Sequence, residues 1–225
     1  KERAIESLAE SRIFASAQYG FPNDLRSYIW TALAQVHQLQ AKHKDVSYHE
    51  LSSRESSWEY VIEKDVVRTL VDDPFFRHPE FKGGEKLNRL LKAYAIFDPE
   101  LGYTQGMNTV AAIILMVMSG YGADQRTWKR KIHSRTCERN AFWILVYIMI
   151  ERQYRRCFTD NYPRLMETLE IFDGVLKEQI PQIVEHMKTY DVSIQAVFMH
   201  QFMTIAGQDS PHEFSIRMMD LFLVE

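Results

Sequence analysis

A glycine-bracketed turn is the part of this chain whose residue types best suit chemistry. The turn, Gly102-Tyr103-Thr104-Gln105-Gly106, stands shortly before an apolar run from Thr109 to Met118. Glycine adopts positive φ at little cost and lets another backbone or a ligand come close, so the turn could present Gln105 at a working surface. The same pattern is typical of a plain helix entry, in which Gln105 would satisfy amides of the first helical turn. The turn alone does not separate these two interpretations.

A second stretch, Ile62 to Thr69, carries a lone arginine among apolar residues at the end of a helical pattern. Arg68 lies three residues after Asp65, a spacing that predicts an ion pair on one helix face. A surface pair of this kind stabilises a helix by only a few tenths of a kcal/mol, and such pairs are common. An ordinary helical ion pair and an arginine presented for function are therefore both compatible with this stretch.

Composition favours a helical globular body and excludes several classes of function. The 225 residues are 46% hydrophobic, and a chain of this length can bury roughly 70% of its unfolded surface. With a net charge of −3, the chain as a whole does not attract nucleic acid or an anionic membrane. Cys137 and Cys157 form no metal-binding or redox motif, which indicates reduced thiols in a cytosolic chain. The first residues lack the apolar block of a signal peptide.

Several motifs of enzymes and binding proteins are missing from the sequence. It contains no G-x-x-x-x-G-K-[ST] phosphate-binding loop, no G-x-S-x-G nucleophile elbow, and no histidines and carboxylates at metal-ligand spacing. Aromatic residues do not interleave with its basic residues, apart from Trp128, so stacking on nucleic acid is not expected. We therefore expect the chain to bind neither a metal nor a nucleotide of its own.

Apolar residues recur at helical spacing along most of the chain, which predicts an all-α fold. A helix over 4–19 is followed by a second helix that carries its apolar stripe from Leu25 to Val36. Residues 40–57 lose this periodicity and are expected to form a surface linker. The apolar runs 109–118 and 141–150 have about half of the roughly 20 residues that cross a bilayer, which predicts core helices. Further helices are predicted over 58–66, 85–97, 161–180, 193–207 and from Pro211 onward.

Other polar residues have more ordinary interpretations. Arg26 and Trp30 lie one helical turn apart, so the guanidinium can stack on the indole and fix the helix against its neighbour. His200 and His212 are expected to be packing and surface residues. A basic connector separates the two apolar runs, and either a solvated loop or a contact with a phospholipid or an acidic partner would explain it. Its basic residues are Arg126, Lys129, Arg130, Lys131, His133, Arg135 and Arg139.

Three segments, in order, resemble the motifs of one known family. Arg26-Ser27-Tyr28-Ile29-Trp30, Ile62 to Thr69, and Tyr103-Thr104-Gln105-Gly106 match the RxxxW, IxxDxxRT and YxQG motifs of the TBC domain. That family supplies GTPase-activating proteins for Rab GTPases and has an all-helical fold. Gly20-Phe21-Pro22 and Asp220-Leu221-Phe222 extend the likeness over nearly the whole chain. One departure is Ala196-Val197-Phe198, where members of the family often carry a Trp-Phe pair.

The resemblance implies a GTPase activator rather than an enzyme that turns over its own substrate. Arg68 matches the family's arginine finger. Gln105 matches its glutamine finger, which orients the attacking water in place of the GTPase's own glutamine. Both side chains would have to emerge side by side at one groove. The implied supporting residues are Asp65 and Thr69 beside Arg68, Tyr103 and Gly106 in the turn, and Arg26 and Trp30 in the scaffold.

The resemblance also implies the partner and the organisation of the domain. The partner would be a GTP-bound Rab-family small GTPase, which itself binds the GTP and the magnesium, so the chain would need no cofactor, metal or nucleic acid. A cytoplasmic chain is expected, recruited to endomembranes through its partner or flanking regions. One domain would span 1–225, with the catalytic motifs in 1–120 and further helices in 121–225, as two helical subdomains around a groove. The rival interpretation is a scaffold of the same fold that docks a GTPase without accelerating hydrolysis.

Overall fold

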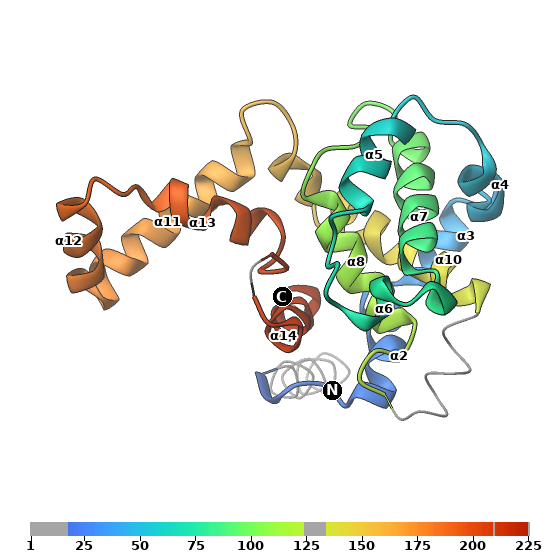
Figure 1. The fold of residues 1–225 in the computed structure, drawn as a ribbon, viewed down its shortest axis with the longest axis horizontal. Helices are drawn as coiled ribbons and strands as arrows, with labels where there is room; N and C mark the ends of the chain where they lie inside the picture. Colours follow the sequence, from blue (N-terminus) through green and yellow to red (C-terminus); the bar gives the residue numbers. More distant parts are fainter. Residues whose placement is uncertain (1–17, 124–133, 209, 225) are drawn as a thin grey trace, which may run out of the picture.

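The computed structural model describes residues 18–123, 134–208 and 210–224, and these residues form helices and turns without a strand. The predicted all-α fold is therefore confirmed. Figure 1 shows a body of packed helices and an arm that projects from it. The body contains α2 (Asn23–Leu33), α3 (Val36–Lys42), α4 (Tyr48–Ser53), α5 (Glu59–Val66), α6 (Pro74–Arg77), α7 (Gly83–Phe97), α8 (Met107–Met118), α10 (Arg135–Val146) and α14 (His212–Val224). The arm contains α11 (Pro163–Gln179), α12 (Pro181–Thr189) and α13 (Ile194–Met203). The predicted helix over 4–19 lies almost entirely outside the described residues.

Helix α8 forms the centre of the body. All of its residues are buried, from Met107 to Met118, as expected for a helix that is apolar on every face. It packs against α7 and α10, and also contacts α2, α5 and α14. The start of α8 is therefore fixed from several sides, and so is the turn that precedes it. No helix among the described residues combines the length and the hydrophobicity that crossing a bilayer requires.

Between the body and the arm, the chain departs twice from α-helical geometry. The α10 helix continues into a π-helical turn, η2 (Tyr147–Glu151), and a 3-10 turn, η3 (Tyr154–Cys157), follows. Helix α11 packs on η3 and on α13, whereas α12 packs mainly on α11. The predicted cap of α13 is confirmed, because the Ser193 hydroxyl accepts a hydrogen bond from the Ala196 N–H at 3.1 Å.

The predicted stripe from Leu25 to Val36 is wrong in two respects. The α2 helix ends at Leu33, and Gln35 takes the left-handed conformation with a φ of 48°, after which α3 begins. Leu25 is 53% exposed, while Arg26 and Trp30 are buried. Trp30 belongs to the hydrophobic core, and Arg26 is buried beside it because the carboxylate of a distant residue, Asp220, accepts hydrogen bonds from both side chains.

The predicted surface linker over 40–57 is also wrong, because it contains α4 and part of the core. The Ser47 hydroxyl caps α4 by accepting from the Glu50 N–H at 3.4 Å. Tyr48 is buried and donates its hydroxyl to Glu138 at 3.1 Å. His43 stacks on Trp143 with 5.7 Å between the ring centroids.

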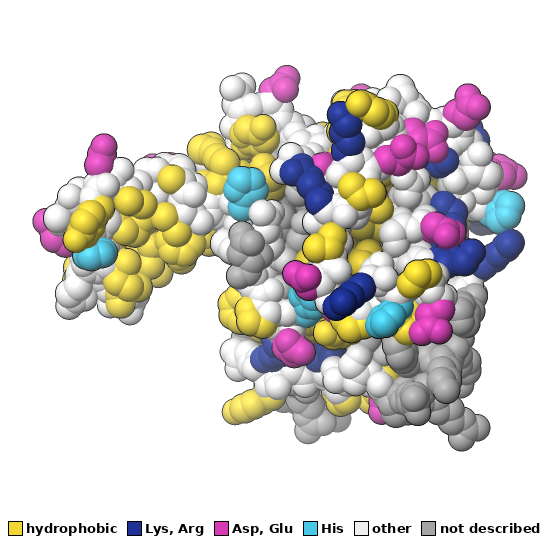
Figure 2. Space-filling view, viewed as in Figure 1, with side chains coloured by type: hydrophobic (Ala, Val, Ile, Leu, Met, Phe, Trp, Pro, Cys, Tyr) yellow, Lys and Arg dark blue, Asp and Glu magenta, His cyan; other side chains and the backbone are white. Residues whose placement is uncertain are grey.

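The arm leaves many apolar side chains uncovered. Its α11 stripe is buried as predicted at Leu165, Leu169 and Leu176. Figure 2 shows hydrophobic side chains spread over one face of the arm. The exposed apolar residues of the arm's helices and of the turns between them are Ile171, Val175, Ile180, Ile183, Tyr190, Val192 and Val197.

Candidate functional site

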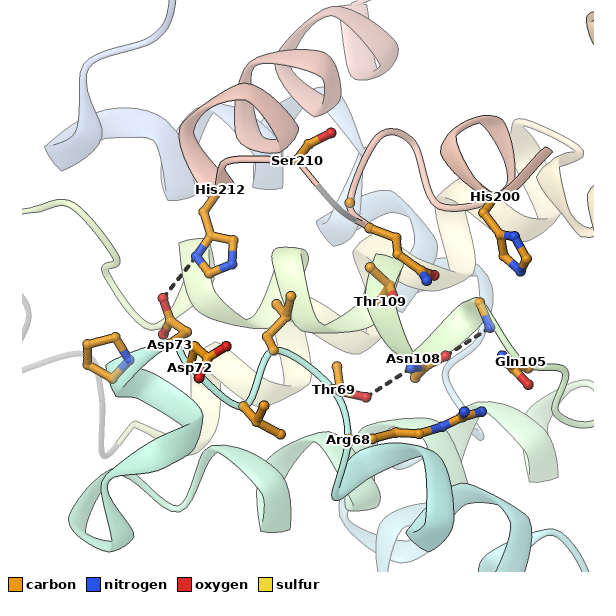
Figure 3. A pocket seen from close by; sticks show the side chains of 16 residues that line it. Arg68, Thr69, Asp72, Asp73, Gln105, Asn108, Thr109, His200, Ser210 and His212 are labelled. Carbon is orange, nitrogen blue, oxygen red and sulfur yellow. Dashed lines mark hydrogen bonds and ion pairs between the residues drawn. The ribbon is translucent and has the colours of Figure 1, made fainter. Parts of the chain in front are cut away.

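A pocket of about 650 Å³ lies where three segments of the chain meet. These segments are the loop that follows α5, the turn that precedes α8, and the stretch between α13 and α14, as Figure 3 shows. Arg68 and Gln105 both line this pocket, although they are far apart in sequence. In Figure 3 the Arg68 side chain extends toward Gln105.

Asp65 holds the Arg68 side chain from one edge. Oδ1 of Asp65 accepts from Arg68 Nε at 3.0 Å and from Nη2 at 2.6 Å. The Arg68 side chain is still 58% exposed, whereas that of Asp65 is 7% exposed. A guanidinium has five N–H donors in a rigid plane. The donors on Nη1 have no hydrogen-bond partner within the described residues, so they are available to an anion in the pocket.

Tyr103 connects this ion pair to the glycine-bracketed turn. Its hydroxyl donates to Oδ2 of Asp65 at 2.6 Å. Burial, followed by the bond to Asp65, raises the pKa of Tyr103 well above its usual value, so the phenol remains a donor at neutral pH. One carboxylate therefore fixes the arginine with one oxygen and the turn with the other.

The two glycines of the turn are required by its geometry. Gly102 has a φ of 64°, and a Cβ at this position would lie 2.3 Å from the Trp58 indole. Gly106 has a φ of 103°, and a Cβ there would meet Met203 Sδ at 3.1 Å. Both φ values lie in the region that L side chains rarely adopt. Gln105 between them is exposed, and no hydrogen bond to the rest of the described chain holds its amide.

Asn108 is a site residue that the sequence interpretation missed. It is buried, and its Oδ1 accepts from the Gly106 N–H at 2.8 Å. Its Nδ2 donates to the Thr69 hydroxyl at 2.9 Å, and that hydroxyl donates to the Asp65 carbonyl at 2.6 Å. Thr69 thus bonds to the backbone of Asp65 and to Asn108 rather than to Arg68. Asn108 stands directly before the apolar run, and no local signal distinguishes it, because its partner Thr69 lies 39 positions away in the sequence.

Two histidines, expected to be packing and surface residues, also line the pocket. Nδ1 of His212 lies 2.9 Å from Oδ2 of Asp73, and this contact joins the start of α14 to the loop before α6. The bond to Asp73 raises the pKa of His212, and burial partly opposes this effect. His200 approaches the pocket from α13.

Arg26 and Trp30 do not line this pocket. Arg26 Nε donates to Asp220 Oδ1 at 3.1 Å, and Trp30 Nε1 donates to the same oxygen at 2.7 Å. Their shared contact is thus a carboxylate of α14 and not the predicted stacking of one side chain on the other. Both residues connect α2 to α14, and neither contacts the pocket directly. Among the described residues, no group of three or more His, Cys, Asp or Glu side chains is placed to hold a metal ion.

The fold and the pocket together define an all-α domain that presents an arginine and a glutamine from two separate segments. The chain belongs to the Rab-GTPase-TBC domain family, whose match covers residues 23–225. It is 29% identical over 208 residues to the GTPase-activating protein GYP5 of Eremothecium gossypii, an alignment that covers 92% of this chain and 22% of that protein. This chain therefore spans about a fifth of the length of that relative.

Two solved structures share the fold. The Chlamydomonas flagellar RabGAP TBC domain superposes with a TM-score of 0.77 at 21% identity, covering 96% of this chain and 66% of that one. The Ypt/Rab-GAP domain of Gyp1p gives a TM-score of 0.75 at 19% identity, covering 96% of this chain and 74% of that one.

Proposed function

We propose that this domain accelerates GTP hydrolysis by a Rab-family small GTPase, to which it supplies Arg68 and Gln105 in trans. The observation that carries this proposal is the convergence of the two side chains at one pocket, each with an exposed end. The names of the relatives support the same activity. The partner would be the GTP-bound form of the GTPase, met at an endomembrane surface, and it would bring both the nucleotide and the magnesium.

Arg68 would stabilise charge that develops on the phosphates in the transition state. An arginine supplied in trans is worth about 10³ to 10⁵ in rate for this reaction, which corresponds to roughly 4 to 7 kcal/mol. The planar guanidinium of Arg68 can keep its hydrogen bonds to Asp65 and still donate from its other N–H groups to phosphate oxygens. The arginine therefore enters the partner's site in a preset orientation, which lowers the entropy cost of using it.

Gln105 would orient the attacking water. A side-chain amide both donates and accepts hydrogen bonds, so it can bind the water and a neighbouring carbonyl or phosphate at once. The Gln105 side chain forms no hydrogen bond within the described residues. Its position in the turn is fixed instead by the flanking glycines and by Tyr103.

Single-turnover GTP hydrolysis by a panel of GTP-loaded Rab proteins tests this function. We expect acceleration of at least about a thousandfold for one or more of them, and loss of most of it in Arg68→Ala and in Gln105→Ala. Matched controls are Arg156→Ala and Gln38→Ala, which change the same residue types outside the pocket. An unchanged rate for Arg68→Ala would contradict the mechanism. Binding of a GTPase without acceleration would show that the domain is a scaffold.

A further inference from the structure

A second pocket, of about 810 Å³, lies on another part of the body. Its walls come from the end of α3, from α4, from the start of α7 and from the start of α10. It shares no lining residue with the pocket that contains Arg68 and Gln105. The proposed GTPase activity therefore leaves this second pocket without a function.

The second pocket is positively charged. Five Lys and Arg residues line it against two glutamates, an excess of three formal positive charges. Figure 2 shows Lys and Arg side chains gathered at the edge of the body where Figure 1 draws α4. The five basic residues are Lys44, Lys82, Arg89, Arg135 and Arg139. Arg135 and Arg139 belong to the basic connector, whose other basic residues lie outside the described part of the chain.

Both glutamates of this pocket already have partners. Oε1 of Glu138 accepts from Arg89 Nη2 at 3.0 Å, and Oε2 accepts from Arg89 Nε and from the Tyr48 hydroxyl, each at 3.1 Å. Glu85 lies 3.6 Å from Lys82 Nζ and 3.9 Å from Arg89. The carboxylates thus neutralise one side of the pocket and leave the other cations available.

Three of the cations, Lys44, Arg135 and Arg139, form no ion pair within the described residues. Arg135 is the first residue of α10, where the helix dipole adds positive potential. The buried Nε2 of Gln40 also lines this side of the fold and has no hydrogen-bond partner among the described residues. A buried donor without a partner is costly and marks a position that a bound acceptor would satisfy.

Hydroxyl groups complete the lining of this pocket, at Ser47, Ser52, Ser53 and Thr136. The three cations without an ion pair in the described part of the chain match more charge than one phosphate carries, and the volume exceeds what one phosphate fills. Hydroxyl side chains can bond the ring hydroxyls of a polyol. We propose that this pocket binds a polyol bearing two or more phosphate groups, of the inositol phosphate type, either free or as a lipid headgroup.

Calorimetric titration with myo-inositol hexakisphosphate tests this proposal on the chain as it stands. We expect saturable binding at one site that weakens as salt rises, since surface charge is screened. The variant Lys44→Gln with Arg139→Gln removes two of these three cations and should weaken binding at least about tenfold, the usual scale for charge-assisted hydrogen bonds. The control Arg156→Gln with Lys188→Gln removes one Arg and one Lys elsewhere and should change the affinity less than about twofold.

The neutral variant Gln40→Leu distinguishes binding inside the pocket from non-specific electrostatic attraction to the protein surface. It removes the Gln40 amide without changing the charge, so weaker binding with an unchanged circular dichroism spectrum would support a formed site. Equal affinity in the control and in Lys44→Gln with Arg139→Gln, or no binding at all by the unmodified chain, would overturn the proposal.

Vesicle sedimentation distinguishes the two sources of the ligand. The probes are phosphatidylcholine vesicles with and without a phosphatidylinositol bisphosphate. Sedimentation that requires the phosphorylated lipid and fails in Lys44→Gln with Arg139→Gln would identify a headgroup site. Binding of the soluble probe alone would identify a free polyphosphate as the ligand. Neither result depends on GTPase activation, because no residue of the pocket that contains Arg68 and Gln105 is altered.

Discussion

Asp65 is the residue on which the geometry of the candidate site depends. Its two carboxylate oxygens serve different segments, Oδ1 for Arg68 and Oδ2 for Tyr103. A buried carboxylate is costly unless charged and polar partners compensate it, and both partners are present here. The Asp65 side chain therefore couples the orientation of the Arg68 side chain to the turn that contains Gln105.

Asn108 makes a second connection between the same segments, and we predict a loss of both stability and activity in Asn108→Ala. The substitution leaves the buried Gly106 N–H without its acceptor and Thr69 without its donor. An unpaired buried group costs about 1 to 3 kcal/mol, which urea unfolding can measure. We also expect GTPase activation to fall at least about tenfold, because a small misplacement of a positioned group is costly in rate.

Asn88→Ala on α7 is the control for this substitution, since Asn88 does not line the pocket that contains Arg68 and Gln105. Full activation by Asn108→Ala, with only its stability reduced, would show that Asn108 supports the fold and not the position of Arg68 and Gln105. Reduced affinity for the GTPase with an unchanged maximal rate would lead to the same conclusion.

At the scale of elements, the contact between His212 and Asp73 attaches α14 to the loop that follows Arg68. Asp73 Oδ1 caps α6 by accepting from the Phe75 N–H at 2.7 Å, while Oδ2 contacts His212. The bond to Asp73 raises the pKa of His212 above its ordinary value of 6.5. The protonated histidine therefore stabilises the folded state fully below pH 6.5, and this stabilisation is lost as the pH rises through the folded-state pKa.

We accordingly predict that His212→Gln lowers the melting temperature more at pH 6 than at pH 9. The measurement is the difference in Tm between the unmodified chain and the variant at each pH. The same difference for His37→Gln, on the exposed side of α3, serves as the control. A difference for His212→Gln that is the same at both pH values would contradict a stabilising ion pair.

Helical periodicity predicted the elements whose burial depends on apolar side chains alone. The α7, α8 and α11 helices belong to this class, since any neighbour can cover a leucine or a valine. Periodicity failed at α2 and α4, where Arg26 and Tyr48 are buried against charged partners. Those partners, Asp220 and Glu138, lie far away in the sequence, so no local pattern contains the information.

The same distinction applies to the candidate site. Arg68 and Gln105 could be proposed because each stands in a short motif. Asn108, Asp73 and His212 could not, because their contacts join positions that only the folded chain brings together. A sequence pattern can thus indicate which side chains are presented, while the residues that position them follow from tertiary structure.

At the scale of the whole molecule, the body is closed by a contact between α2 and α14. Asp220 on α14 is fully buried, and its carboxylate accepts from Arg26 and Trp30 of α2 and from the backbone N–H of Phe21 at 3.3 Å. Arg26 and Asp220 are 194 positions apart. This contact joins the ends of the domain while α8, which carries the turn, lies against both helices.

Asp220→Ala should therefore destabilise the whole domain more than any surface change. Removing one partner of a buried ion pair costs about 3 to 5 kcal/mol, because Arg26 would remain buried without its counter-charge. Asp220→Asn keeps one acceptor and should cost less, and Glu185→Ala on the exposed face of α12 should cost under about 0.5 kcal/mol. Equilibrium unfolding in urea gives all three values. If Asp220→Ala cost less than about 1 kcal/mol, the pair would not contribute to closing the body, and apolar packing of α14 on α8 would have to hold the two ends together.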